Sequence, residues 1–255
     1  MTTKTPGSHE KLAQTVACTA CPVRQMALFR PVSDAQLDWT QRNRSGQLRL
    51  ASHTRVFDQG ARVEHCYTLF SGWAILHRTN DNGQRQILHV ALPGDFLGFQ
   101  SDIDGPMNHG VTTVTEAILC AFPRARVREL INENSALAQQ MTWMIARDLD
   151  IGRYHIEALG RRSAIERIAY LLLELFYRCH DRCAINGDLL EMPLTQDEIG
   201  DTLGLTNVHV SRTLAEIHRR GLIDRHGHQI HFRDLATLGH LASFEPHMVE
   251  PKPLF

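Results

Sequence analysis

Six cysteines carry the most reactive side chains of this 255-residue sequence: Cys18, Cys21, Cys66, Cys120, Cys179 and Cys183. In a reducing compartment, cysteines are thiols or metal ligands more often than disulfides. Cys18 and Cys21 have the Cys-x-x-Cys spacing of a redox-active dithiol. Cys179 and Cys183 lack the second pair that a zinc site needs, so we interpret them as two incidental thiols.

A second chemical pattern lies in residues 194–232, where the signals that start and stop helices follow one another closely. The capping box Thr195-Gln196-Asp197-Glu198 starts a short helix, and Gly204 ends it. Thr206 can cap a second helix that spans residues 207–220. A helix, a short turn and a second helix form the helix-turn-helix plan. Two apolar stretches around His226-Gly227-His228 then predict a small hairpin, or wing.

The second helix carries side chains that can read DNA. A recognition helix in the major groove presents its N-terminal residues to base edges. Arg212 can donate two hydrogen bonds to a guanine, and Arg219, Arg220 and Arg225 are expected near backbone phosphates. The candidate DNA-contacting residues are Thr206, Asn207, His209, Ser211, Arg212, Arg219, Arg220 and Arg225.

The overall charge gives this prediction no support. The chain has 27 Lys and Arg against 28 Asp and Glu, so it lacks the basic excess typical of many nucleic-acid-binding proteins. Locally, residues 207–228 carry four arginines against Glu216 and Asp224. The alternative interpretation is a three-helix packing module whose arginines are solvated.

The elements that position these residues can be read from the rest of the chain. Short apolar runs between residues 46 and 122 are separated by turn signals such as Asp81-Asn82-Gly83 and Pro93-Gly94-Asp95, a pattern typical of a β-barrel or jelly roll. A broad apolar stripe predicts a long helix over about 135–160. Such a helix suits dimerisation, although a core helix of one domain is the alternative. A further helix is expected over 163–179.

The chain has no apolar run long enough for a transmembrane helix. Residues 1–10 are polar and lack the apolar segment of a secretory signal. We therefore expect a cytoplasmic protein with no membrane partner.

Several of these motifs together resemble the CRP/FNR superfamily of bacterial transcription regulators, over about residues 18–240. The motifs that carry the resemblance are Tyr67–Gly72, Leu92–Gly98, the long helix, Leu203–Thr206 and Val210–Arg212. The resemblance implies an α+β fold with an N-terminal β-roll of the jelly-roll, cyclic-nucleotide-binding type, a dimerisation helix and a C-terminal winged helix-turn-helix. It also implies a homodimer on palindromic double-stranded DNA and an interaction with RNA polymerase.

On this basis the chain divides into five segments. They are a flexible N-terminus (1–17), a β-roll sensor (18–133), a dimerisation helix (134–162), a DNA-binding domain (163–245) and a tail (246–255). Ser211 and Arg212 match the base-reading pair of the family. The FNR branch usually has glutamate where this chain has Val208, so we expect a half-site that differs from the usual FNR one.

The sequence does not decide which signal the protein senses. Cyclic nucleotide is not expected, because residues 99–123 contain no Lys or Arg and only His109 could approach the role of the phosphate-binding cation. Cys18, Cys21 and Cys120 match ligand positions of the iron–sulfur cluster in oxygen-sensing FNR proteins, but the fourth position is Ala27. Cys66 or a histidine could complete the set.

Two alternatives to a cluster remain. Cys18 and Cys21 could act as a redox dithiol, or Cys66 and Cys120 could be small core residues of a protein with another ligand or none. Among other functions, a cupin-like metalloenzyme is not favoured, because the roll offers no His-x-His pair followed by glutamate. A partner-binding module without DNA binding is the third hypothesis.

Overall fold

This computed structural model of the chain describes residues 10–26, 33–182, 187–246 and 249. The chain forms two compact units. Among the described residues, the first unit holds 10–25 and 33–142, and the second holds 143–182, 187–246 and 249, with Met26. The boundary between the two units lies inside the long helix. The sequence analysis assigns residues 134–162 to a separate dimerisation helix.

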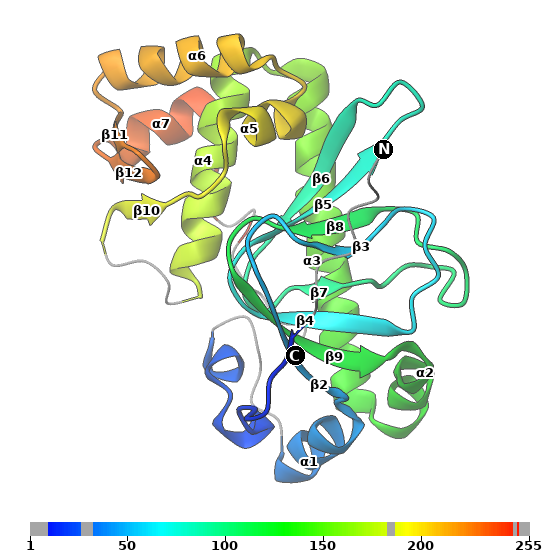
Figure 1. Ribbon diagram of the computed structural model, residues 1–255. Helices are drawn as coiled ribbons and strands as arrows, with labels where there is room; N and C mark the ends of the chain where they lie inside the picture. The colour runs from blue at the N-terminus through cyan, green and yellow to red at the C-terminus, as the bar shows by residue number, and fades with distance from the viewer. Residues whose placement is uncertain (1–9, 27–32, 183–186, 247–248, 250–255) are drawn as a thin grey trace. The chain divides into compact units, whose positions relative to one another are not determined.

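The first unit is a β-roll built from two antiparallel sheets (Figure 1). One sheet has the strand order β1-β2-β9-β4-β7 and the other has the order β3-β8-β5-β6. The strands of the first sheet are β1 (Glu10–Lys11), β2 (Gly46–Leu50), β9 (Ala117–Pro123), β4 (His65–Ser71) and β7 (Phe96–Leu97). Those of the second sheet are β3 (Arg55–Phe57), β8 (Gly110–Thr113), β5 (Ala74–Thr79) and β6 (Arg85–Ala91).

The strands form because their apolar residues alternate toward a common core. Leu69, Leu97, Val111 and Leu119 are buried in this core. The predicted hairpin joins β5 to β6 at Gly83, whose φ of +78° is accessible mainly to glycine. The β-roll fold predicted from the sequence is therefore confirmed.

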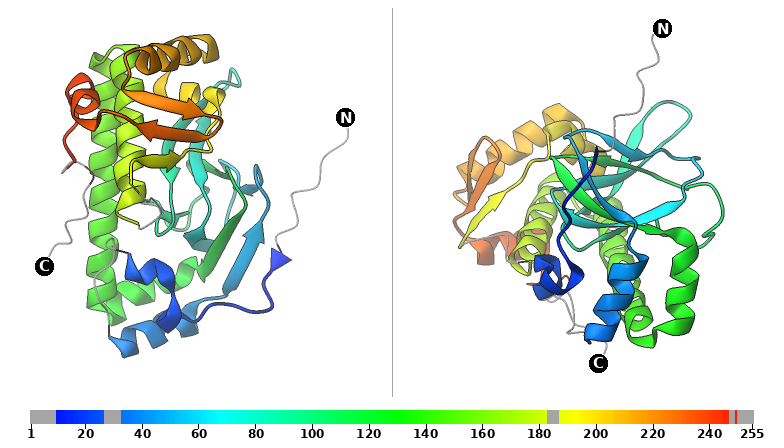
Figure 2. Two further views of the ribbon diagram at one scale, coloured as in Figure 1. Left: turned by 90° about the vertical axis from the view of Figure 1, so that its left-hand side faces the viewer. Right: turned by 60° about the horizontal axis from the view of Figure 1, so that its bottom comes forward.

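Short helical segments accompany the roll in the described part of the first unit. The 3₁₀ turns η1 (Cys18–Ala20) and η2 (Pro22–Gln25) are followed by α1 (Asp34–Asn43), and α2 (Arg124–Glu133) follows β9 directly. Figure 2 shows α1 and α2 at the same end of the roll. α3 (Ser135–Arg161) is the long helix that the apolar stripe predicted, and its first residues belong to this unit.

The second unit contains the rest of α3 and the C-terminal elements. These are α4 (Ala164–His180), β10 (Leu189–Glu191), α5 (Gln196–Leu203), α6 (Asn207–Arg219), β11 (Ile223–His226), β12 (Gln229–Phe232) and α7 (Leu235–Ala242). α5 and α6 are the predicted helix pair, and β11 and β12 are the predicted wing. In the part of the chain that the structure describes, no helix is both long and apolar enough to cross a membrane.

Three features differ from the sequence-based expectations. Residues 10–17 were expected to be flexible, but β1 pairs with β2 and the Val16 amide donates to Gln47 Oε1 at 3.0 Å. α2 was not predicted, because its apolar residues repeat over little more than one turn. β10 was not predicted either, since a three-residue strand needs the β12 edge to define it.

Candidate nucleic-acid interface and cysteine site

The turn between α5 and α6 is fixed by local hydrogen bonds. The Glu198 amide donates to Thr195 Oγ1 at 3.2 Å, and the Thr195 amide donates to Glu198 Oε2 at 2.8 Å, which closes the predicted capping box. α5 ends at Gly204, whose φ of +64° is the left-handed conformation. The His209 amide donates to Thr206 Oγ1 at 3.3 Å and caps α6. The predicted start and end of α5 and the predicted start of α6 are confirmed, and α6 ends at Arg219, one residue before its predicted end.

Close packing of the turn against α5 fixes the direction in which α6 begins. The Leu205 amide donates to the Gly200 carbonyl at 3.0 Å. A Cβ atom built on Gly200 would lie 2.4 Å from the Leu205 carbonyl oxygen, so only glycine fits there without a backbone shift. Figure 1 shows α6 crossing one end of α4, with α5 beside it. The start of α6 is therefore held by backbone contacts.

α6 has one buried face and one exposed face. Val210, Leu214 and Ile217 are buried, as the sequence predicted. The opposite face is exposed and follows the helical spacing of three and four residues. From the start of the helix it presents Val208, Ser211, Arg212, Ala215 and Arg219.

Arg212 is the cation on this face that no acidic side chain holds. It makes no ion pair or hydrogen bond with any other residue that the structure describes. Arg219 and Arg220, by contrast, both donate to Glu216, with Arg220 Nε 2.8 Å from Glu216 Oε1. The Arg220 hydrogen bond lowers the pKa of the Glu216 carboxyl. Arg212 is thus ready to bind an external acceptor, whereas the other two arginines must first leave Glu216.

Two of the predicted contact residues are already engaged within the protein. The Thr206 hydroxyl accepts the capping hydrogen bond of α6. Asn207 Nδ2 donates to Asp197 Oδ1 at 2.7 Å, so this amide is oriented by α5. His209 is exposed on the first turn of α6. The role of Asp197 in orienting Asn207 was missed, because only the folded turn brings residues ten apart into contact.

The wing holds the remaining predicted arginine. Arg225 lies on β11 opposite Ile230 of β12, and the strands are joined at Gly227. Arg233 Nε donates to Asp224 Oδ2 at 2.6 Å, and this hydrogen bond lowers the pKa of the Asp224 carboxyl. β10 pairs with β12 and makes the wing a three-stranded sheet.

The first unit holds three of the predicted cysteines, Cys18, Cys21 and Cys120. Cys18 lies on η1, Cys21 follows it, and Cys120 lies on β9. Cys120 and Cys21 both act electrostatically on the Cys18 thiol, and Cys21 acts on the Cys120 thiol. Gln47 of β2 is paired in register with Cys120, and its Nε2 donates to Cys120 Sγ at 3.3 Å. The Cys18 amide donates to Gln41 Oε1 of α1 at 2.9 Å, which joins η1 to α1.

Burial favours the protonated form of two of these thiols, Cys18 and Cys120. It raises the pKa of Cys18, and Arg44 lowers that pKa only in part. Burial also raises the pKa of Cys120, against a smaller lowering by the Gln47 hydrogen bond. The thiol forms are therefore favoured, and binding a metal would require proton release. Gln41, Gln47 and Arg44 were not identified from the sequence, because nothing in their spacing relates them to the cysteines.

The three thiols fit an iron–sulfur cluster in ligand type, since such clusters are bound by cysteine thiolates. The set is one ligand short, because Ala27 carries no donor, and residue 27 lies outside the described residues. Cys66 packs with Val127 and Met141 in an apolar cluster, and burial raises its pKa to about 12, which makes it a poor fourth ligand. No described set of three ligand atoms that includes Cys18 lies within 4.8 Å, so a mononuclear site is not preformed.

Two further predicted residues are placed as follows. His109 is buried, and burial lowers its pKa to about 4, so the imidazole is neutral at physiological pH. A neutral ring cannot replace the cation that a cyclic phosphate needs. Cys179 is buried in α4, whereas Cys183 lies outside the described residues.

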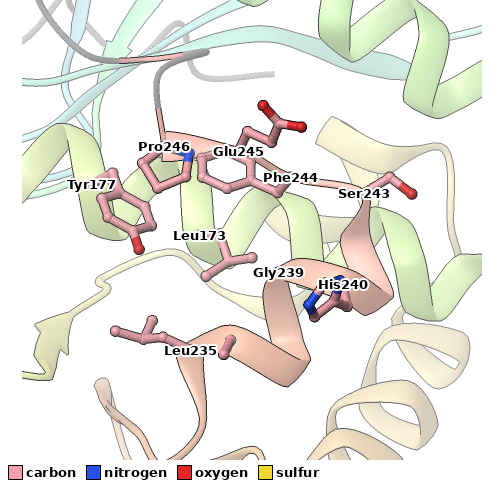
Figure 3. Close-up of a pocket in the computed structure, with 10 residues that line it drawn as sticks. Leu173, Tyr177, Leu235, Gly239, His240, Ser243, Phe244, Glu245 and Pro246 are labelled. Atoms are coloured by element: carbon pink, nitrogen blue, oxygen red, sulfur yellow. The ribbon is translucent and has the colours of Figure 1, made fainter.

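A separate groove of about 560 Å³ lies between α4 and α7 (Figure 3). Leu173 and Tyr177 of α4 form one side, and the other side is formed by α7 and residues 243–246. None of its lining residues belongs to α5, α6 or the wing. The groove is thus distinct from the exposed face of α6.

Two family models match the chain, one in each unit. Residues 166–241 match the model of the Crp-like helix-turn-helix domain. Residues 47–134 match the model of the cyclic nucleotide-binding domain. The second match describes the fold of the roll, which is the same whether or not its ligand is a nucleotide.

Whole-chain relatives are regulators. The nitrogen fixation regulation protein FixK of Bradyrhizobium diazoefficiens is 31% identical over 208 residues, covering 81% of this chain and 85% of FixK. The transcriptional activator protein FnrL of Cereibacter sphaeroides is 29% identical over 213 residues, covering 82% of this chain and 85% of FnrL. The solved structure of FixK2 from Bradyrhizobium japonicum has a TM-score of 0.69 at 26% identity and covers 76% of this chain and 96% of that one.

Proposed function

This chain belongs to the CRP/FNR family of transcription regulators, and from that premise we propose that it binds a palindromic DNA site as a homodimer under the control of a redox or oxygen signal. The protein is a DNA-binding regulator and not an enzyme. Within the proposed DNA-binding domain, residues 163–245, the contact surface is the exposed face of α6 together with the wing.

The observation that carries this proposal is the state of Arg212. An exposed guanidinium without an internal partner, one turn into a capped helix, suits a bidentate hydrogen bond to guanine. Ser211 lies beside it and can donate to a base or a phosphate. Arg219, Arg220 and Arg225 supply phosphate contacts, and Thr206, Asn207 and His209 line the start of the helix.

Selection of duplexes from a random library tests the proposal directly. We expect the purified protein to enrich a palindrome whose half-sites lie about one helical turn apart, because two recognition helices in a symmetric dimer are spaced that way. Enrichment of a single asymmetric site, or no enrichment, would contradict it.

The proposed dimer contact is an exposed apolar row on α3. Ile145, Leu149 and Ile156 are all exposed in the single chain, with Ile156 at 72%. With Gly152 they are spaced by four, three and four residues, which is the a/d repeat of a two-stranded coiled coil. A Cβ atom on Gly152 would meet no atom within 4 Å, so the row has room for a second helix. A second copy of α3 would cover these side chains.

Leu149→Asp is expected to convert the dimer into a monomer, because two carboxylates would face each other in an apolar seam. Light scattering after size-exclusion chromatography measures the mass. Affinity for the selected palindrome should fall with it, since each monomer can hold only one half-site. Asp150→Ala is the matched control, because Asp150 is exposed on the same turn and outside the row. A dimeric Leu149→Asp protein would place the interface elsewhere.

For the signal, we propose that Cys18, Cys21 and Cys120 form the receiving site and hold an iron–sulfur cluster, which would supply a redox-sensitive group there. The electrostatic interactions among these thiols and the FNR-branch resemblance support this. The neutral, buried His109 supports the expectation that the roll takes no cyclic nucleotide.

Protein purified without oxygen should contain iron and acid-labile sulfide and absorb visible light. Cys18→Ser and Cys120→Ser should lose the iron, and Cys66→Ala should keep it. Iron at background in the unmodified protein would remove the cluster. In that case, reversible oxidation of Cys18 and Cys21, measured by thiol titration, would favour the dithiol.

Membership of the family supports proposals for one further partner and for the location of the protein. We propose that the DNA-bound dimer contacts RNA polymerase, as a transcription regulator must influence initiation. Because its target is chromosomal DNA, we place its action in the cytoplasm.

A further inference from the structure

Val208 is an apolar side chain on the exposed face of α6, with 58% of its surface accessible. It lies one turn before Ser211 and Arg212, since residues three and four apart share a helix face. The surface proposed to face DNA therefore begins with two methyl groups, followed by a hydroxyl and a guanidinium.

The folded unit does not require valine at this position. The buried face of α6 is formed by Val210, Leu214 and Ile217, and the cap is formed by Thr206. A β-branched side chain is a weaker helix former than alanine, because its χ1 freedom is restricted in a helix. An exposed valine in the first turn thus has a conformational disadvantage and no packing gain within the unit.

The base edges in the major groove offer one apolar group. Adenine, guanine and cytosine present hydrogen-bond donors and acceptors, whereas thymine also presents its C5 methyl group. A valine placed against a polar edge would remove water from it without supplying a hydrogen bond. Against the thymine methyl, the same side chain makes an apolar contact and leaves no polar group unpaired.

We propose that Val208 contacts the C5 methyl group of a thymine in each half-site and so specifies an A·T pair near the pair that Arg212 reads. This inference rests on the proposed function, because it requires α6 to lie in the major groove. The contact would also explain why the expected half-site differs from that of the FNR branch. The usual glutamate of that branch would accept a hydrogen bond from cytosine instead.

Uracil substitution tests the contact with the change of a single methyl group. In the selected palindrome, each thymine of a half-site is replaced in turn by deoxyuridine, and the dissociation constant is measured at fixed salt. For the unmodified protein we expect about a four-fold loss of affinity at one thymine, which corresponds to one buried methyl group. Symmetric replacement in both half-sites should multiply the effect to about 16-fold.

Val208→Ala should bind the thymine duplex as weakly as the unmodified protein binds the duplex with uracil in both half-sites. The variant should no longer distinguish these two duplexes. Leu189→Ala is the matched control, because it shortens another exposed apolar side chain of the same unit and should keep the full uracil effect. Val208→Glu should exchange the preference for thymine with one for cytosine at that position.

The outcomes separate this inference from the proposed function. If binding is specific and depends on Arg212, but no thymine is sensitive to loss of its methyl group, the role of Val208 is wrong and the proposed function stands. If the unmodified protein selects no sequence at all, both are wrong.

Discussion

Arg212→Ala is expected to abolish the preference for one base pair in each half-site while leaving the affinity for unrelated DNA almost unchanged. A bidentate arginine–guanine contact contributes about 1–3 kcal/mol of discrimination. A symmetric dimer makes the contact twice, so the expected loss is roughly 2–6 kcal/mol, or about 30-fold to more than 10⁴-fold in affinity for the palindrome. Fluorescence anisotropy with the selected duplex and a shuffled duplex, at the same salt concentration, measures it.

Arg219→Ala is the matched control, because it removes the same charge from the same helix face. Arg219 is paired with Glu216 and is proposed to contact a phosphate. Its loss should weaken binding to all sequences alike and reduce the salt slope by about one unit for each protomer, or about two for the dimer. Both residues are exposed, so neither change should alter the free energy of unfolding by more than about 0.5 kcal/mol. If the two variants act alike on every duplex, the assignment of base-reading and phosphate-contacting roles is wrong.

The helix-turn-helix could be predicted in detail because its signals are local. The capping box at Thr195, the left-handed Gly204 and the cap at Thr206 each act on residues within one helical turn. Sequence spacing therefore specifies them without knowledge of the rest of the chain. The same holds for the hairpin at Gly83.

The residues that contact the cysteines could not be predicted from the sequence. The spacing of Cys18 and Cys21 and a family resemblance pointed to Cys120. Gln47 reaches Cys120 only because β2 pairs with β9, and Gln41 reaches Cys18 only because η1 packs on α1. In the sequence alone, such a glutamine cannot be distinguished from other polar residues, because strand register and packing decide what it contacts.

The second unit contains a buried ionic network that the sequence did not indicate. Glu174 and Arg178 of α4 have the spacing of a common surface ion pair, yet both are almost wholly buried. Arg178 Nη1 donates to Glu174 Oε1 at 2.7 Å, and His155 of α3 contacts the other carboxylate oxygen. One carboxylate thus serves two cations from two helices of the second unit. Burial follows from tertiary packing, so helical spacing alone could not distinguish this network from solvated charges.

Burial would raise the pKa of the Glu174 carboxyl, but His155 and Arg178 outweigh it and hold the pKa at about 2. Burial would likewise lower the pKa of His155, but Glu174 outweighs it, so that pKa is raised. The stability from Glu174 is present above its unfolded pKa of about 4.5 and is lost as the pH falls toward 2. The stability from His155 is present below its unfolded pKa of about 6.5 and is lost as the pH rises through the raised value.

Glu174→Ala is therefore expected to destabilise the protein by about 3–5 kcal/mol, because it removes the carboxylate that pairs with two buried basic side chains. Urea denaturation at a series of pH values measures this loss. The difference from the unmodified protein should be largest between pH 4.5 and 6.5 and should shrink on both sides. Asp150→Ala, which breaks the exposed pair with Arg153, should change stability by no more than about 1 kcal/mol.

A triple replacement separates the charges from the shape of the site. His155→Phe, Glu174→Leu and Arg178→Met together remove these three ionisable groups and keep similar volumes. Replacing a buried ionic set as a whole is often neutral or stabilising, whereas removing one member is costly. We therefore expect the triple variant to recover most of the stability lost in Glu174→Ala and to lose the pH dependence. A triple variant as unstable as Glu174→Ala would mean that side-chain shape, and not charge pairing, makes this position sensitive.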